Sequence, residues 1–146
     1  MIIIPDSNIL ISALINNKGN EFKILAHTGN SITFKVPSFL ISEIDNKVAI
    51  ISRLTLSAPA AITVNIQVLL NHIIVVSDDD MPDEIVKKAQ NLLLNIDIND
   101  TAFVALAMLY NGLLWTGDLK LLRGLRRKGF TQIITTKDLE NIIKGL

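Results

Sequence analysis

The stretch Asp97–Asp118, DINDTAFVALAMLYNGLLWTGD, decides how the rest of the chain is interpreted. It begins with two acidic residues three positions apart, Asp97 and Asp100, and continues as an almost wholly apolar helix. An Asn-Gly pair supplies the left-handed stop for that helix, and a short apolar strand then delivers Asp118 just beyond its end. A helix that begins with a carboxylate and a strand that ends with one would point into the same cleft of a parallel sheet.

Length and composition indicate one ordinary domain with a substantial core. The chain has 146 residues, of which 49% are apolar and 19% charged. The charged share is below the roughly 25% usual for soluble domains, which suggests elements buried on both faces or a sizeable interface. The formal net charge is zero, so the total charge gives no hint of nucleic-acid binding. The chain has no cysteine, which excludes disulfides and thiolate metal sites.

No segment reads as a membrane anchor or a signal peptide. The apolar run at the N-terminus, Met1–Ile4, is cut off by Pro5. The longest apolar stretch, 58–76, contains two asparagines, a glutamine and a histidine, which a membrane span of about 20 residues would not tolerate well. We therefore expect a cytoplasmic protein with no membrane partner.

Short apolar runs alternate with helical patterns along the whole chain. The expected strands are Ile2–Ile4, Ser31–Val36, Ile73–Val76, Leu113–Thr116 and Gln132–Thr135. The expected helices are Ile9–Ile15, Glu21–His27, Ser38–Ile51, Ala60–Asn71, Asp83–Leu94, Asn99–Tyr110, Leu119–Lys128 and Asp138–Lys144. Alternation of this kind predicts an α/β domain, residues 1–146, with a parallel sheet between helices.

Several acidic residues each have a structural alternative. Asp6 follows the first strand, where it either caps the next helix or lies at the ligand-binding edge of the sheet. Glu43 is either a surface charge paired with Lys47 one helical turn away or a fourth acid in the cleft. The acids Asp78, Asp79, Asp80, Asp83 and Glu84 favour helix capping over a metal site.

Asp6 and Asp118 follow strands that can be neighbours at the topological switch point of an α/β sheet. With Asp100 and Glu43 nearby, several carboxylates would converge, and such a cluster either raises its pKa values or binds a cation. Oxygen ligands without Cys or His suit Mg²⁺ or Mn²⁺, which can activate water for phosphodiester hydrolysis. The sequence has no GxxxxGK[ST] or GxGxxG motif and no candidate Ser-His or Cys-His pair.

Four segments, in this order, resemble the PIN-domain nucleases: IIIPDSNILISALI (Ile2–Ile15), VPSFLISEI (Val36–Ile44), DTAFVALAM (Asp100–Met108) and LLWTGD (Leu113–Asp118). The resemblance implies a three-layer α/β/α sandwich with a five-stranded parallel sheet and metal-dependent cleavage of RNA. It also points to the short bacterial and archaeal members that include VapC-type toxins. Such relatives suggest a homodimer and an antitoxin partner.

The resemblance also implies roles for individual residues. By position, the acidic quartet around Mg²⁺ or Mn²⁺ would be Asp6, Glu43, Asp100 and Asp118, with Ser7, Asn8 and Thr116 as polar neighbours. Asp97 has no sure counterpart. It is a helix cap, an acid outside the metal's own ligands, or a ligand in place of Asp100, and we favour the first two.

An acidic site needs nearby bases to hold RNA phosphates. The expected source is the helix after Asp118, with Lys120, Arg123, Arg126, Arg127 and Lys128, whose alternative is an ordinary solvated face. We expect no aromatic platform for stacked bases. The leading hypothesis is an endoribonuclease. The others are a non-catalytic RNA-binding or interaction module on the same fold, and a phosphoacceptor signalling domain using Lys137.

Overall fold

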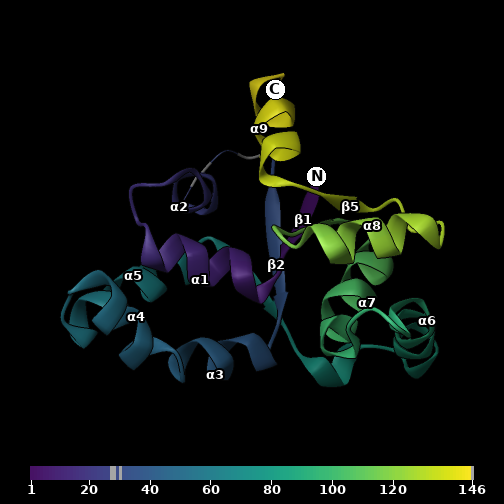
Figure 1. Ribbon diagram of the computed structural model, residues 1–146, viewed down its shortest axis with the longest axis horizontal. Coiled ribbons are helices and arrows are strands. Elements are labelled where there is room, and N and C mark those ends of the chain that lie inside the picture. Colours follow the sequence, from purple (N-terminus) through teal and green to yellow (C-terminus); the bar gives the residue numbers. More distant parts are fainter. Residues whose placement is uncertain (27–28, 30, 146) are drawn as a thin grey trace.

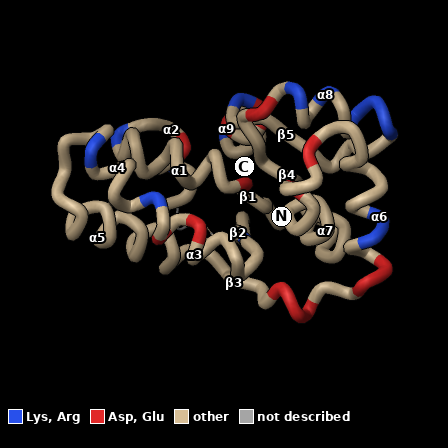
Figure 2. Tube along the Cα trace, turned by 60° about the horizontal axis from the view of Figure 1, so that its bottom comes forward, with Lys and Arg blue, Asp and Glu red and all other residues tan. Residues whose placement is uncertain are grey.

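Five parallel strands form the centre of the fold, in the computed structural model that describes residues 1–26, 29 and 31–145. The strands are β1 (Ile2–Pro5), β2 (Thr33–Pro37), β3 (Ile73–Val76), β4 (Leu113–Trp115) and β5 (Ile133–Ile134). The sheet lies between two groups of helices in Figure 1, and its strands follow the order β3-β2-β1-β4-β5 (Figure 2). The predicted five-stranded parallel sheet is therefore confirmed, with strand ends that differ by one or two residues.

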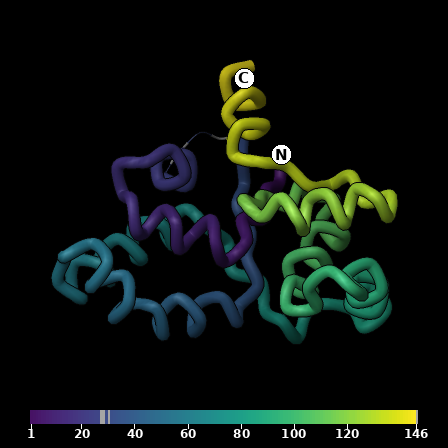
Figure 3. The backbone as a smooth tube through the Cα atoms, viewed as in Figure 1, coloured from purple at the N-terminus to yellow at the C-terminus, as the bar shows by residue number. Residues whose placement is uncertain are grey.

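Helices cover both faces of this sheet. They are α1 (Ser7–Ile15), α2 (Asn20–Leu25), α3 (Phe39–Asp45), α4 (Val48–Thr55), α5 (Pro59–Leu70), α6 (Asp83–Leu93), α7 (Thr101–Tyr110), α8 (Leu119–Arg127) and α9 (Thr136–Lys144), with short 3₁₀ turns η1 (Asp78–Asp80) and η2 (Ile98–Asp100). The trace keeps α1 to α5 on one side and then crosses to the other side for α6 to α8 (Figure 3). This is the predicted three-layer α/β/α arrangement.

The core explains why the strands are continuous apolar runs. Ile3 and Ile4 of β1 are fully buried, as are Leu114 and Trp115 of β4. Helices that cover both faces of a parallel sheet favour apolar residues at successive strand positions. The edge strand β3 is less covered, and its Ile74 and Val75 are exposed. Helix α7 lies against β1, β2 and β4 and is itself covered by α6, so its residues 103–107 are all buried.

The helix expected over Ser38–Ile51 is wrong in one respect. It is divided into α3 and α4 at Asn46 and Lys47, where the Lys47 amide donates to the carbonyl of Ile44 at 2.9 Å. The helix α3 ends in Asp-Asn, two residues of low helix propensity, which favours a break there. α4 then ends at Leu56, in the left-handed conformation with φ of 53°. His27, the expected end of the second helix, lies outside the described residues, and α2 ends at Leu25.

In the part of the chain that the structure describes, no single helix is long and apolar enough to cross a membrane. Helices α4 and α5 would meet that test only if counted together, and they are bent by 111° at the break between them.

Candidate active site

Two of the predicted acids meet at the switch point of the sheet, where β1 and β4 are neighbours. The Asp6 amide donates to the carbonyl of Trp115 at 3.0 Å and so extends the pairing of the two strands. The hydroxyl of Thr116 donates to Oδ2 of Asp6 at 2.5 Å and accepts from the Asp118 amide at 3.0 Å. One buried hydroxyl therefore fixes Asp6 and Asp118 relative to each other.

Both of these carboxylates also cap helices. Oδ1 of Asp6 accepts from the Ile9 amide at 3.0 Å at the start of α1. Oδ1 of Asp118 accepts from the amides of Lys120 and Leu121 at 3.0 and 3.1 Å at the start of α8. Capping and placement in the cleft were alternatives for Asp6 on sequence grounds, yet a single side chain serves both. Asp6 is only 3% exposed.

The other pair of acids comes from η2, at the start of α7. Oδ1 of Asp97 accepts from the Asn99 amide at 3.0 Å, so Asp97 is a cap, as favoured. Asp100 directly precedes α7 and does not cap it through its side chain. Its carboxylate is partly buried in the cleft beside Asp97.

Glu43 reaches the same cleft from α3. Its Oε2 accepts a hydrogen bond from the hydroxyl of Ser7 at 3.0 Å. This contact joins α3 to the first turn of α1, 36 residues earlier in the chain. The alternative pairing of Glu43 with Lys47 is absent from the described residues, in which the ion pair is Glu84–Lys88 at 3.6 Å.

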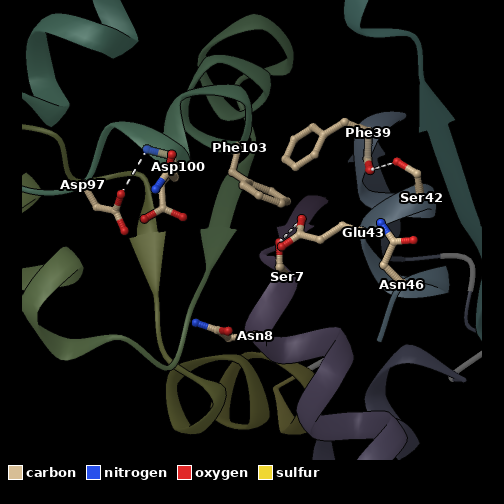
Figure 4. A pocket seen from close by; sticks show the side chains of 10 residues that line it. Ser7, Asn8, Phe39, Ser42, Glu43, Asn46, Asp97, Asp100 and Phe103 are labelled. Carbon is tan, nitrogen blue, oxygen red and sulfur yellow. Dashed lines mark hydrogen bonds between the residues drawn. The ribbon is translucent and has the colours of Figure 1, made fainter. Parts of the chain in front are cut away.

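Glu43, Asp97 and Asp100 line a cleft of about 560 Å³ (Figure 4). Asp97 and Asp100 lie on one side and Glu43 on the other, with Ser7 between them. The lining residues are Ser7, Asn8, Phe39, Ser42, Glu43, Asn46, Asp97, Asn99, Asp100 and Phe103. A second hollow of about 280 Å³ is lined by Asn8, Ile9, Ser12, Glu21, Gly117 and Asp118. Asn8 lines both, so the Asp118 side adjoins the main cleft.

The acids influence one another electrostatically. Burial, together with the negative charges of Asp97, Asp6, Asp118 and Glu43, raises the pKa of Asp100 to about 7. Burial also raises the pKa of Asp6, with a smaller contribution from Asp118, while the hydrogen bond from Thr116 opposes the rise. Lysine and arginine are missing from the lining of both hollows. The described cleft therefore concentrates negative charge without a cationic side chain to balance it.

The donor atoms suit a hard cation, but the acids are not closed around a metal position. Among the described residues, no three His, Asp or Glu side chains form a group that could hold an ion as they stand. The available donors are carboxylate, hydroxyl and amide oxygens, the set that Mg²⁺ and Mn²⁺ prefer. A cation would relieve the repulsion that acts on Asp100.

The basic residues of α8 divide into two groups. Lys120, Arg123 and Arg127 line a hollow of about 220 Å³, together with Asn95, Ile96 and Gly124. Arg126 instead donates to the Ile133 carbonyl at 3.2 Å, and Lys128 donates to the carbonyls of Leu92 and Leu94 at 2.8 and 2.6 Å. In the view of Figure 2 the basic residues of α8 lie along the top edge, and the acidic run at η1 and the start of α6 lies along the bottom edge.

Five cleft residues were missed on sequence grounds: Phe39, Ser42, Asn46, Asn99 and Phe103. By its helical spacing Phe39 fits the apolar stripe of the helix expected over Ser38–Ile51. Once Glu43 is placed in the cleft, helical spacing also brings Phe39, Ser42 and Asn46 to the same side, because residues three or four apart are neighbours on a helix. That spacing was the available signal.

A sequence profile describing the PIN domain matches residues 4–140. The chain belongs to the PIN domain family. No curated protein sequence matches this PIN domain significantly. Similar solved structures include the VapBC2 complex of Rickettsia felis bound to a DNA fragment from its promoter, with 17% identity, coverage of 92% of this chain and 97% of that one, and a TM-score of 0.64.

Two further structures resemble this PIN domain. PAE2754 from Pyrobaculum aerophilum shares 18% identity over 99% of this chain and 90% of its own, with a TM-score of 0.67. A toxin-antitoxin complex from Klebsiella pneumoniae shares 14% identity over 91% of this chain and 96% of its own, with a TM-score of 0.62. At these identities the likeness shows the fold.

Proposed function

We propose that this PIN domain is a Mg²⁺- or Mn²⁺-dependent endoribonuclease that hydrolyses phosphodiester bonds in RNA. The observation that carries the proposal is the acidic cleft lined by Glu43, Asp97 and Asp100, with Asp118 in the adjoining hollow. Burial and the negative charges of Asp97, Asp6, Asp118 and Glu43 raise the pKa of Asp100 there to about 7. PIN domains are generally nucleases, which supports the same assignment. A cluster of carboxylates at the ligand-binding edge of an α/β sheet has metal binding as its most direct use.

The four acids would hold the metal, which when bound supplies an activated water and charge stabilisation at the phosphate. The buried hydroxyl of Thr116 links the Asp6 carboxylate to the backbone amide of Asp118 and so sets where the two residues stand. Ser7 orients Glu43 by donating to Oε2. The raised pKa of Asp100 means that this carboxyl binds a proton near neutral pH when no cation is present. Metal binding would displace that proton.

We expect Lys120, Arg123 and Arg127 to hold RNA phosphates, rather than all five basic residues of α8 and its C-cap. These three line one hollow. Two of the residues that line it lie close in the sequence to acids of the site. Lys120 lies two residues after Asp118, and Asn95 lies two residues before Asp97. Replacing the three cations with alanine should weaken RNA binding and lower the slope of log affinity against log salt by about 2. The same change at Lys18, Arg53 and Lys87, exposed elsewhere, should do less.

The partners are also proposals. The Rickettsia and Klebsiella structures are toxin-antitoxin assemblies, which supports a toxin role for this chain with an antitoxin as its partner. Leu54, Leu56 and Val64 of the α4–α5 region are 63%, 95% and 61% exposed, which supports a protein interface there with an antitoxin or a second copy. Such a toxin would act in the cytoplasm.

RNA cleavage with Mn²⁺ or with EDTA tests the enzymatic proposal. Wild-type protein should cleave single-stranded RNA only with the metal, and Asp118→Asn should reduce cleavage to background. Asparagine retains an oxygen that can cap α8, so this variant should still fold. Asp45→Asn, at an exposed acid of α3 outside the cleft, is the matched control and should remain active.

Equal cleavage in EDTA would contradict metal dependence. A non-catalytic RNA-binding module would instead show RNA affinity that is indifferent to metal and survives Asp6→Asn, with no cleavage under either condition.

A further inference from the structure

One face of α3 and its C-terminal cap lies along the wall of the cleft. Phe39, Ser42, Glu43 and Asn46 all line it, at positions i, i+3, i+4 and i+7. The proposed function uses Glu43 alone. The remaining three place an aromatic ring, a hydroxyl and a carboxamide beside the acids.

The aromatic ring is Phe39, which packs on a buried partner. Its centroid lies 5.5 Å from that of Phe103, with the planes at 69° in an edge-to-face arrangement. Phe103 is 1% exposed and belongs to the core, whereas Phe39 is only partly buried and lines the cleft. The Phe103 contact holds the Phe39 ring in place. Phe39 thus presents a fixed apolar surface in the cleft, beside Phe103 and among polar and acidic side chains (Figure 4).

The polar groups beyond the ring are suited to an uncharged ligand. Asn46 is exposed at the C-cap of α3, and its carboxamide offers both a donor and an acceptor. The Ser42 hydroxyl donates to the Phe39 carbonyl at 2.9 Å, which leaves its oxygen able to accept. The neighbouring acids repel phosphate, so the part of a nucleotide that this wall can receive is the base.

We propose that Phe39 and Asn46 form a nucleobase subsite, in which one unpaired base of single-stranded RNA stacks on Phe39 while its edge bonds to Asn46. This subsite rests on the proposed ribonuclease function for its biological meaning. Stacking on an aromatic side chain is available to every base, whereas a carboxamide distinguishes base edges. Phe39 therefore supplies affinity and Asn46 supplies preference. A base paired within a duplex cannot reach the ring, so the subsite selects single strands.

Binding of uncharged nucleosides tests the subsite without any cleavage. Adenosine and uridine in EDTA should show saturation transfer from the wild-type protein to their base protons by nuclear magnetic resonance. Phe39→Leu keeps an apolar contact with Phe103 but removes the ring face, so the transfer should disappear. Phe39→Tyr should retain it. Phe22→Leu makes the same change at a partly buried phenylalanine outside the cleft and should leave transfer unchanged.

Cleavage kinetics with Mn²⁺ then separate this inference from the proposed function. Phe39→Leu should raise KM for a short single-stranded RNA by roughly tenfold or more, with kcat little changed and with Phe39→Tyr close to wild type. Asn46→Ala should alter the preference among bases at one position. Nucleoside binding without any wild-type cleavage would overturn the ribonuclease and leave the subsite standing. Cleavage with unchanged KM and base preference in Phe39→Leu and Asn46→Ala would overturn the subsite.

Discussion

Thr116→Val removes the hydroxyl that joins the two central acids and retains the β-branched shape of the side chain. The hydroxyl donates to Oδ2 of Asp6 and accepts from the amide of Asp118, and Thr116 is 1% exposed. Water has little access to the freed Asp6 carboxylate, which is 3% exposed, and the Asp118 amide is partly buried. We therefore expect the substitution to destabilise the metal-free protein although it creates almost no cavity.

The expected cost combines two hydrogen bonds. A bond to an ionised carboxylate contributes about 1.5–3 kcal/mol, and a buried amide left without an acceptor costs about 1 kcal/mol. The sum is a loss of about 2.5–4 kcal/mol at pH 8. The cost should shrink at lower pH, because the Thr116 hydroxyl lowers the pKa of Asp6 and its removal raises that pKa further. When a carboxyl has a higher pKa in the folded state than in the unfolded state, the protein becomes less stable as pH rises.

Urea unfolding in EDTA at pH 8 and pH 5 measures both effects. The matched control is Thr63→Val, because the exposed Thr63 hydroxyl bonds only to the Pro59 carbonyl one turn earlier, at 3.1 Å. That variant should change the free energy of unfolding by a few tenths of a kcal/mol, about equally at both pH values. The reasoning is refuted if Thr116→Val behaves like this control, or if its cost is larger at pH 5 than at pH 8.

Three further predictions concern stability. The pKa of Asp100 is raised to about 7, so metal-free wild type should lose stability as pH rises from about 4 to 7, and Asp100→Asn should flatten that slope in thermal melts with EDTA. Leu56 has a left-handed backbone conformation and is 95% exposed. Leu56→Asn removes the backbone strain of a leucine in that conformation and should raise the free energy of unfolding in urea by about 0.5–1 kcal/mol. A lower free energy of unfolding would contradict this account. Gly124→Ala places a Cβ 2.7 Å from Cδ1 of Ile96 and should cost about 1–3 kcal/mol, partly recovered in the double variant with Ile96→Ala.

The sequence was sufficient to predict the sheet and the strand ends that carry Asp6 and Asp118. Continuous β-branched runs such as Ile2–Ile4 are diagnostic when both faces of a sheet are buried, and a polar residue directly after such a run marks the carboxyl edge. The PIN resemblance added Glu43, which composition and spacing alone would have left on the surface. The roles of the predicted site residues in catalysis stay predictions.

What escaped prediction depends on contacts distant in the sequence. Arg126 and Lys128 look like free bases on α8, but each donates to a backbone carbonyl of another segment. Phe39 fits an apolar stripe whether it faces the core or a cleft. Helical periodicity predicts which residues share one side of a helix, but it does not predict what that side packs against. The division between α3 and α4 is a local effect of the low helix propensity of Asp45 and Asn46. The apolar residues on both sides continue with helical spacing, and this spacing hid the break.

The hydrogen bond between Thr116 and Asp6 joins residues 110 positions apart. During synthesis the ribosome makes Asp6 well before Asp118, so β1 has no β4 beside it until α7 and β4 have also emerged. An unfinished chain would therefore carry a first acid without its partners. If the protein cuts RNA as proposed, a chain made only as far as β3 has Asp6 and Glu43 without Asp100 and Asp118, and it should not cleave RNA.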